Sequence, residues 1–165
     1  IMALVLHLAP VDFPPLALPL PLQFIFRLLA SFCGVFGFSI MFNSPKRLAA
    51  TAAMIGAIAN TFRLELVDLT AFPPAAAAFL GALVAGLLAS LIKNQAGYPR
   101  ISLTVPSIVI MVPGLYLYRA IYNLGIMSLT TSASWFASAF LIIIALPFGL
   151  IFARILTDRT FRYCT

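Results

Sequence analysis

The chain has 165 residues; 63% of them are hydrophobic, 8% are charged, and the formal net charge is +6. A soluble domain carries about 25% charged residues, so this composition excludes a water-soluble fold and predicts an all-α integral membrane protein with four or five spans of roughly 20 residues each. The Lys and Arg residues lie singly or in pairs rather than in a stripe, which excludes a nucleic-acid interface and indicates membrane orientation instead.

The residue types give no support to enzymatic chemistry. The two cysteines, Cys33 and Cys164, lie far apart in the sequence, and His7 is the only histidine. A disulfide framework, a metal site and a glycine-rich phosphate loop all lack their usual motifs. We therefore expect a protein that is not an enzyme and that binds no metal or cofactor.

Residues 1–21 form the first expected segment. Residues 10–21 contain five prolines, which forbid a continuous helix and favour an extended or interfacial linker. We expect a proline-rich N-terminal extension or linker. Because the first residue is Ile rather than Met, we also expect the natural chain to continue upstream.

The first expected span covers residues 22–42, and Arg27 near its start is expected to snorkel to the membrane interface. The span is followed by the turn sequence Asn43-Ser44-Pro45. Ser44 suits a helix N-cap and Pro45 suits the first helical position. This sequence predicts a helix stop followed at once by a restart.

The second expected span, residues 47–67, becomes polar near its end. Asn60 and Arg63 are three residues apart and share one helix face, whereas Glu65 and Asp68 share another. Arg63 therefore has no carboxylate three or four residues away and needs a partner from another helix, a ligand or water. An arginine that snorkels to the interface is the alternative.

The third expected span, residues 75–92, is the most uniform. Small residues repeat every four positions on two adjacent faces, in the series Gly81/Ala85/Ala89 and Ala82/Gly86/Ser90. Such series favour close helix packing, so we expect this span to be packing core without chemistry.

The fourth expected span, residues 101–123, contains Pro106, Pro113 and Gly114. Each proline removes a backbone donor and frees a carbonyl four residues earlier. In hydrocarbon such groups are tolerated only where protein or a water-lined cavity satisfies them. Broken membrane helices of this kind often form the substrate sites of transporters. We expect a helix break at these three residues, in a segment that either crosses the membrane or re-enters.

A half-helix is expected to start near residue 115, and it places Tyr116, Arg119, Tyr122 and Asn123 within one turn of one another. The unpaired N–H groups at its start favour an anion, and Arg119 has a fork of donors that matches a carboxylate. Alternatively, the tyrosines form an aromatic belt at the membrane interface and the side chain of Arg119 snorkels to that interface. This alternative does not explain the two prolines and the Pro-Gly step.

The fifth expected span, residues 133–156, is followed by a basic tail at residues 157–165. Basic residues follow the first, third and fifth spans, whereas the opposite loops carry Glu65 and Asp68 or no charge. With five spans, the positive-inside rule places the N-terminus outside and the C-terminus in the cytoplasm. A re-entrant fourth segment would change this parity.

Three stretches carry a family resemblance: 37–48 (GFSIMFNSPKRL), 56–68 (GAIANTFRLELVD) and 104–120 (TVPSIVIMVPGLYLYRA). Together they resemble the threonine/serine exporter superfamily, and more narrowly its C-terminal or small-subunit, YjjB-like domain. The resemblance covers about residues 22–156. Its most specific elements are the Phe-Asn-x-Pro turn, with Asn43 and Pro45, and the element with two prolines seven residues apart.

The resemblance implies an inner- or plasma-membrane protein that exports threonine and serine or related small carboxylates. It also implies a homo- or hetero-oligomer with a larger partner, similar to the threonine/serine exporter N-terminal domain, on a separate chain or fused upstream. A polar residue at the position of Asn60 and an arginine at that of Arg63 match the family.

We therefore expect a subunit or domain of a secondary exporter of small amino acids. Arg119 and Arg63 would hold the substrate carboxylate at the broken fourth span. An ion-coupling relay, most simply for protons, would use Glu65 and Asp68 or lie in the partner. Two other functions stay open: a non-transporting scaffold that assembles the partner, and a small-anion channel.

Overall fold

The computed structural model describes residues 19–70, 72–96 and 99–158. These residues are all-helical, as expected, and form the helices α2 (Leu20–Met41), α3 (Lys46–Thr70), α4 (Pro74–Ala96), α5 (Arg100–Val109), α6 (Gly114–Gly125) and α7 (Leu129–Thr157). Most of the expected N-terminal extension and C-terminal tail lies outside the described residues. Leu20 and Pro21, which we assigned to the extension, already belong to α2.

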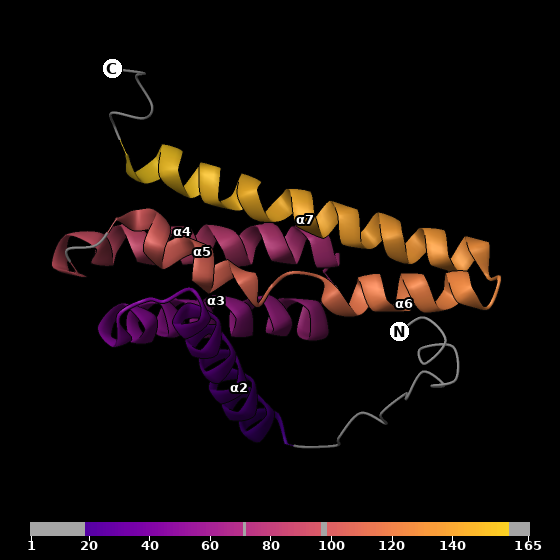
Figure 1. Ribbon diagram of the computed structural model, residues 1–165, viewed down its shortest axis with the longest axis horizontal. Coiled ribbons are helices and arrows are strands. Elements are labelled where there is room, and N and C mark those ends of the chain that lie inside the picture. The colour runs from indigo at the N-terminus through magenta and orange to yellow at the C-terminus, as the bar shows by residue number, and fades with distance from the viewer. Residues whose placement is uncertain (1–18, 71, 97–98, 159–165) are drawn as a thin grey trace.

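Four helical layers run side by side along the long axis of the molecule, and one helix lies at an angle to them. The layers are α3, α4, the α5–α6 pair and α7, while α2 lies at a steep angle against α3 (Figure 1). Each expected span coincides with a helix or, for the fourth, with the pair α5 and α6. The expected start of the last span at residue 133 was wrong, because α7 already begins at Leu129 with Ser128 at its N-cap position.

The turn between α2 and α3 depends on Asn43. Its φ of 57° is in the left-handed region, which asparagine tolerates better than most residues. The Ser44 N–H reaches back to the Ser39 carbonyl at 3.1 Å. Pro45 directly precedes α3, and its carbonyl accepts the Ala49 N–H at 2.9 Å. Pro45 therefore precedes the first helical residue and does not occupy that position itself.

Small residues let the central helices pack backbone against backbone. A Cβ added to Gly149 of α7 would lie 2.5 Å from the carbonyl oxygen of Phe79 in α4, and one added to Gly56 of α3 would lie 2.9 Å from that of Ser107 in α5. The buried core accordingly consists mostly of alanines. As expected for a packing helix, α4 buries its small-residue series against neighbouring helices of the same chain.

The chain is not helical between α5 and α6, and the axes of these two helices are bent by 41°. Pro106 lies inside α5, which continues to Val109, and Pro113 directly precedes α6. The carbonyl of Val109, which Pro113 leaves without its helical donor, accepts the Val112 N–H at 3.2 Å instead. The interruption therefore lies at residues 110–113.

The helices α6 and α7 form a hairpin that extends past the ends of α3 and α4 (Figure 1). The turn between them contains Met127, with a φ of 60°. Ser132 Oγ donates to the Ala120 carbonyl at 2.7 Å and ties the two helices together. The C-terminal half of α7 then packs along α4.

Three helices are long and apolar enough to cross a membrane: α2, the Pro74–Ile92 part of α4, and α7; α5 and α6 make a fourth if the bent pair is one span. Large apolar side chains cover their outer faces. The chain is therefore a multi-pass membrane protein. The expected count of about five spans is not confirmed, because it requires α3, whose polar residues exclude it from this set.

Candidate functional site

A cavity of about 380 Å³ lies beside the interruption between α5 and α6. Its walls come from the C-terminal half of α3, residues 110–113, the first turn of α6 and Ile142 of α7. Its polar side chains are Arg63, Asp68 and Tyr116. Small-molecule sites have volumes of roughly 300–1,000 Å³ and combine apolar walls with a few polar groups, so the cavity is large enough for a small metabolite.

Arg63 extends from α3 toward the interruption. Its Nη1 donates to the Met111 carbonyl at 3.2 Å, a carbonyl in the non-helical stretch that can accept a donor from another helix. Its Nε is buried without a hydrogen-bond partner in the described part of the chain. No carboxylate among the described residues lies within 4.0 Å of its guanidinium.

This environment leaves Arg63 able to bind an anion. A buried charge is stable only when it is paired or hydrogen-bonded, and one neutral carbonyl satisfies a small part of the five donors of a guanidinium. Gly81 of α4 makes room for it, because a Cβ there would lie 3.1 Å from the Cβ of Arg63. The expectation that Arg63 needs a partner from another helix is met in part by Met111.

The carboxylates of α3 are already paired. Arg27 Nη1 donates to Glu65 Oε1 at 2.9 Å, and Arg27 Nη2 donates to Asp68 Oδ2. Arg27, which was expected to snorkel to the membrane interface, therefore has two carboxylate partners on α3. Asp68 remains half-exposed and also lines the cavity, whereas Glu65 is largely covered.

Asn60 and Arg63 contact different neighbours, although they were expected to share a face. Asn60 is buried and donates through Nδ2 to Ser31 Oγ of α2 at 2.8 Å. Its Oδ1 and the Thr61 hydroxyl have no hydrogen-bond partner within the described residues. Asn60 thus lies at the α2–α3 contact and does not line the cavity.

The cluster expected on α6 is divided. Tyr116 lines the cavity, but Arg119 lies over the ring of Trp135 in α7, with its Cζ 4.9 Å from the ring centroid. Asn123 Nδ2 donates to the Arg119 carbonyl at 2.7 Å. Tyr122 stacks on Tyr118 at a centroid distance of 6.5 Å. Arg119, Tyr122 and Asn123 are outside the cavity lining.

Of the residues expected to break the helix, Pro113 and Gly114 line the cavity, and a Cβ added to Gly114 would meet nothing within 4 Å. Pro106 is buried within α5. Two residues that contact the expected arginines were not predicted: Met111, whose carbonyl accepts from Arg63, and Trp135, whose ring lies under Arg119. Trp135 is the single tryptophan of the chain. Its rarity was the one sequence feature that could have marked it as a contact residue.

A family model described as threonine/serine exporter, ThrE, matches residues 27–156. The matched region contains every residue of the cavity lining and all of the α6–α7 hairpin except Thr157. No curated protein and no solved structure matches the chain. The match confirms the resemblance that the three sequence stretches carry.

Proposed function

This chain belongs to the threonine/serine exporter family, and we propose that it binds the exported amino acid in the cavity between α3 and the α5–α6 interruption. The observation that carries the proposal is Arg63, a covered guanidinium that lines this cavity and has no carboxylate partner within the described residues. A fork of guanidinium donors matches the geometry of a carboxylate.

The second charge of the cavity suits an amino acid. A zwitterion carries an ammonium beside its carboxylate, and Asp68 lines the same cavity as Arg63. Asp68 is half-exposed, and its partner Arg27 also binds Glu65. The ammonium can therefore share Asp68 while Arg27 stays paired with Glu65. The Tyr116 hydroxyl adds a donor or acceptor for the hydroxyl of threonine or serine.

This assignment moves the substrate site away from Arg119. Its guanidinium lies on the indole of Trp135, an interaction that provides the charge with an internal partner. We assign Arg119, Tyr122 and Asn123 to the packing of the α6–α7 hairpin, and we keep Arg63 and Tyr116 as substrate contacts. We assign Asn60 to the packing of α3 against α2, through its hydrogen bond to Ser31.

The exporter would work with a larger partner subunit or domain in the inner membrane, as the family resemblance implies. Export against a gradient requires an ion-coupling group, and we propose protonation of Glu65 or Asp68 for this step. Both carboxylates share Arg27, so protonation of either would weaken the contact between α2 and α3 next to the cavity.

The site can be tested by cysteine protection in the full chain with Cys33 and Cys164 replaced by serine. Gly114→Cys introduces a thiol at the cavity wall, where a Cβ meets nothing within 4 Å, and Gly37→Cys is a matched control on α2 with equally open space. Threonine should slow thiol labelling of Gly114→Cys and leave Gly37→Cys unchanged. Protection of neither variant, or of both, would remove the cavity as the substrate site.

Reconstitution separates transport from the other two functions. We expect threonine flux only when the chain and its partner are both present, together with an ion gradient. Full flux from the partner alone would favour a scaffold, and conductance without an ion gradient would favour a channel. Small-residue faces could also bind a partner in a scaffold, but those of α4 already pack inside the chain.

A further inference from the structure

A second cavity, of about 460 Å³, lies between the start of α5 and the end of α7. It is separate from the amino-acid site, and none of its lining residues lines the first cavity. Arg100, Arg154 and Asp158 supply its charge, and Val105, Leu150 and Ile151 supply much of its apolar wall. The proposed export function uses none of these residues.

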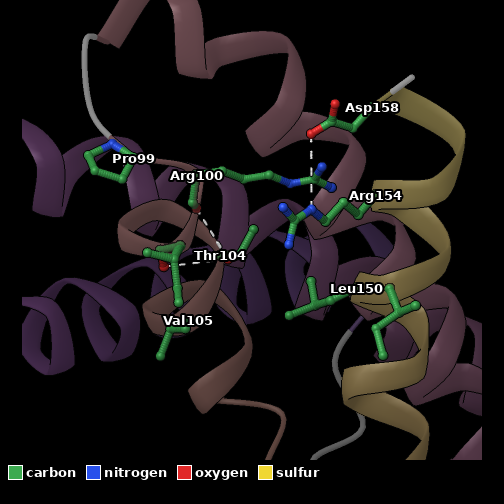
Figure 2. Close-up of a pocket in the computed structure, with 9 residues that line it drawn as sticks. Pro99, Arg100, Thr104, Val105, Leu150, Arg154 and Asp158 are labelled. Carbon is green, nitrogen blue, oxygen red and sulfur yellow. Dashed lines mark hydrogen bonds and ion pairs between the residues drawn. The ribbon is translucent and has the colours of Figure 1, made fainter. Parts of the chain in front are cut away.

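Figure 2 shows the guanidinium groups of Arg100 and Arg154 next to each other, with Asp158 beyond them. Arg100 is held in place by two bonds, from Nη1 to Thr157 Oγ1 and from Nη2 to the Gly86 carbonyl, each 3.0 Å long. Arg154 Nε lies 4.0 Å from Asp158 Oδ2. Among the described residues that line the cavity, the charged side chains are two arginines and one aspartate.

We propose that this cavity binds the phosphodiester headgroup of an anionic phospholipid between Arg100 and Arg154, with an acyl chain along Val105, Leu150 and Ile151. Two adjacent cations repel each other, and a phosphodiester between them replaces repulsion with charge-assisted hydrogen bonds. The bonds to Thr157 and Gly86 pre-orient Arg100, so little side-chain freedom is lost on binding.

The apolar wall selects a lipid rather than a free phosphate. Val105 and Ile151 are exposed large hydrophobic residues, and Figure 2 shows Val105 and Leu150 on the side of the arginines away from Asp158. A charged end followed by an apolar groove is complementary to a headgroup followed by its chain. Inorganic phosphate would leave the groove without an occupant.

The surrounding charge selects an anionic rather than a zwitterionic lipid. The start of α3, which carries Lys46 and Arg47, lies at the same end of the bundle as the start of α5 and the end of α7 (Figure 1). Basic residues near a bilayer attract anionic lipids by about 1 kcal/mol each, which is about fivefold in affinity. Asp158 opposes this attraction.

The test is native mass spectrometry of the full chain with phosphatidylglycerol, which carries one negative charge, and with zwitterionic phosphatidylethanolamine. We expect phosphatidylglycerol to bind more tightly. Arg100→Gln with Arg154→Gln should weaken its binding by at least about tenfold, whereas Arg119→Gln, on the hairpin, should have no effect. Asp158→Asn should strengthen it by about fivefold, a gain that misfolding cannot produce.

Three results would overturn the proposal. Equal binding of both lipids would show that charge does not select the ligand. Competition by glycerol phosphate at the same concentration as the lipid would show that the apolar wall plays no part, and the cavity would then be a phosphate site. Unchanged phosphatidylglycerol binding in both the double arginine variant and Asp158→Asn would place the lipid elsewhere on the protein.

Discussion

Two arginines near Tyr116 have contrasting surroundings. Arg63 contacts a single neutral carbonyl at the helix interruption, and its Nε has no partner within the described residues. Arg119 lies on the indole ring of Trp135 in the α6–α7 hairpin. Tyr116 connects the two regions, because it lines the cavity beside Arg63 and packs edge-on against Trp135 at a centroid distance of 5.5 Å.

The difference shows that the neighbours of an arginine in the fold, and not the residues beside it in the sequence, determine whether its guanidinium can bind a ligand. The sequence pattern around Arg119 was the richer one, with two tyrosines and an asparagine within one turn. In the fold, Tyr122 stacks on Tyr118, Asn123 bonds to the Arg119 carbonyl, and the Arg119 guanidinium lies on Trp135. Few polar residues surround Arg63 in the sequence. Its guanidinium uses one N–H in the bond to Met111, and its Nε has no partner within the described residues.

The largest expected effect is that of Arg63→Gln on threonine export. Removing one member of a covered charge pair costs about 2–5 kcal/mol, so we expect the initial export rate at low substrate to fall about 100-fold. Arg119→Gln removes an aromatic contact worth about 0.5–1 kcal/mol and should change export by less than about threefold. The measurement is efflux of labelled threonine at matched membrane levels of each variant.

Equal losses in the two variants would remove the distinction between the regions. A larger loss in Arg119→Gln would return the substrate carboxylate to α6. Arg63→Lys is a useful intermediate, because it keeps the charge and loses the bidentate fork. We expect its export rate to lie between those of the wild type and Arg63→Gln.

The second-largest expected effect is a loss of stability in the variant Arg27→Gln. This change leaves Glu65 and Asp68 without their shared cation, in a site that is partly covered. Exposed pairs contribute about 0.2–1 kcal/mol and buried ones cost about 3–5 kcal/mol when broken. We expect a loss of about 1–2 kcal/mol in the free energy of unfolding in mixed micelles.

Glu65→Gln provides the internal control for this pair. In the Arg27→Gln background it removes one of the two unpaired carboxylates, so it should restore part of the lost free energy. If Arg27→Gln and the double variant are equally unstable, the carboxylates do not depend on Arg27. A substitution of Arg119 should not interact with either change.

A smaller effect is expected from Gly81→Ala, which acts on Arg63 indirectly. Its Cβ would lie 3.1 Å from the Cβ of Arg63 and 3.3 Å from the sulfur of Met111, so both must shift by a few tenths of an ångström. A misplacement of 1 Å can cost about 100-fold, and we expect about a threefold fall in threonine export. Gly37→Ala, whose Cβ meets nothing within 4 Å, should leave export unchanged.

Sequence alone predicted the helices well, because each apolar run has the length of a span and the turn residues mark where helices stop. The proline break of a single fourth span stays a prediction, although the chain is not helical at residues 110–113, next to Pro113. The start of α7 was missed because residues 127–134 are uncharged and rich in serine and threonine, which suggested a loop. In the structure Ser132 is helical and bonds to Ala120 of α6.

The partners within the site could not be predicted in the same way. Helical spacing determines which residues share a face, but the neighbour that each face meets depends on how the helices cross. Arg27 lies 38 and 41 residues from its carboxylates, and only the steep crossing of α2 brings them together. Trp135 likewise reaches Arg119 only because α7 folds back along α6.

The smallest expected effect is that of Trp135→Phe. The ring of phenylalanine can still face Arg119 and Tyr116, but it attracts a cation less strongly than the indole. We expect a loss of about 0.5 kcal/mol in the free energy of unfolding, together with unchanged threonine export. Phe136→Leu, at an exposed neighbouring position of α7, is the matched control and should have a smaller effect on stability. A fall in export as large as that of Arg63→Gln would mean that Trp135 and Arg119 belong to the substrate site, and the two regions would then be one.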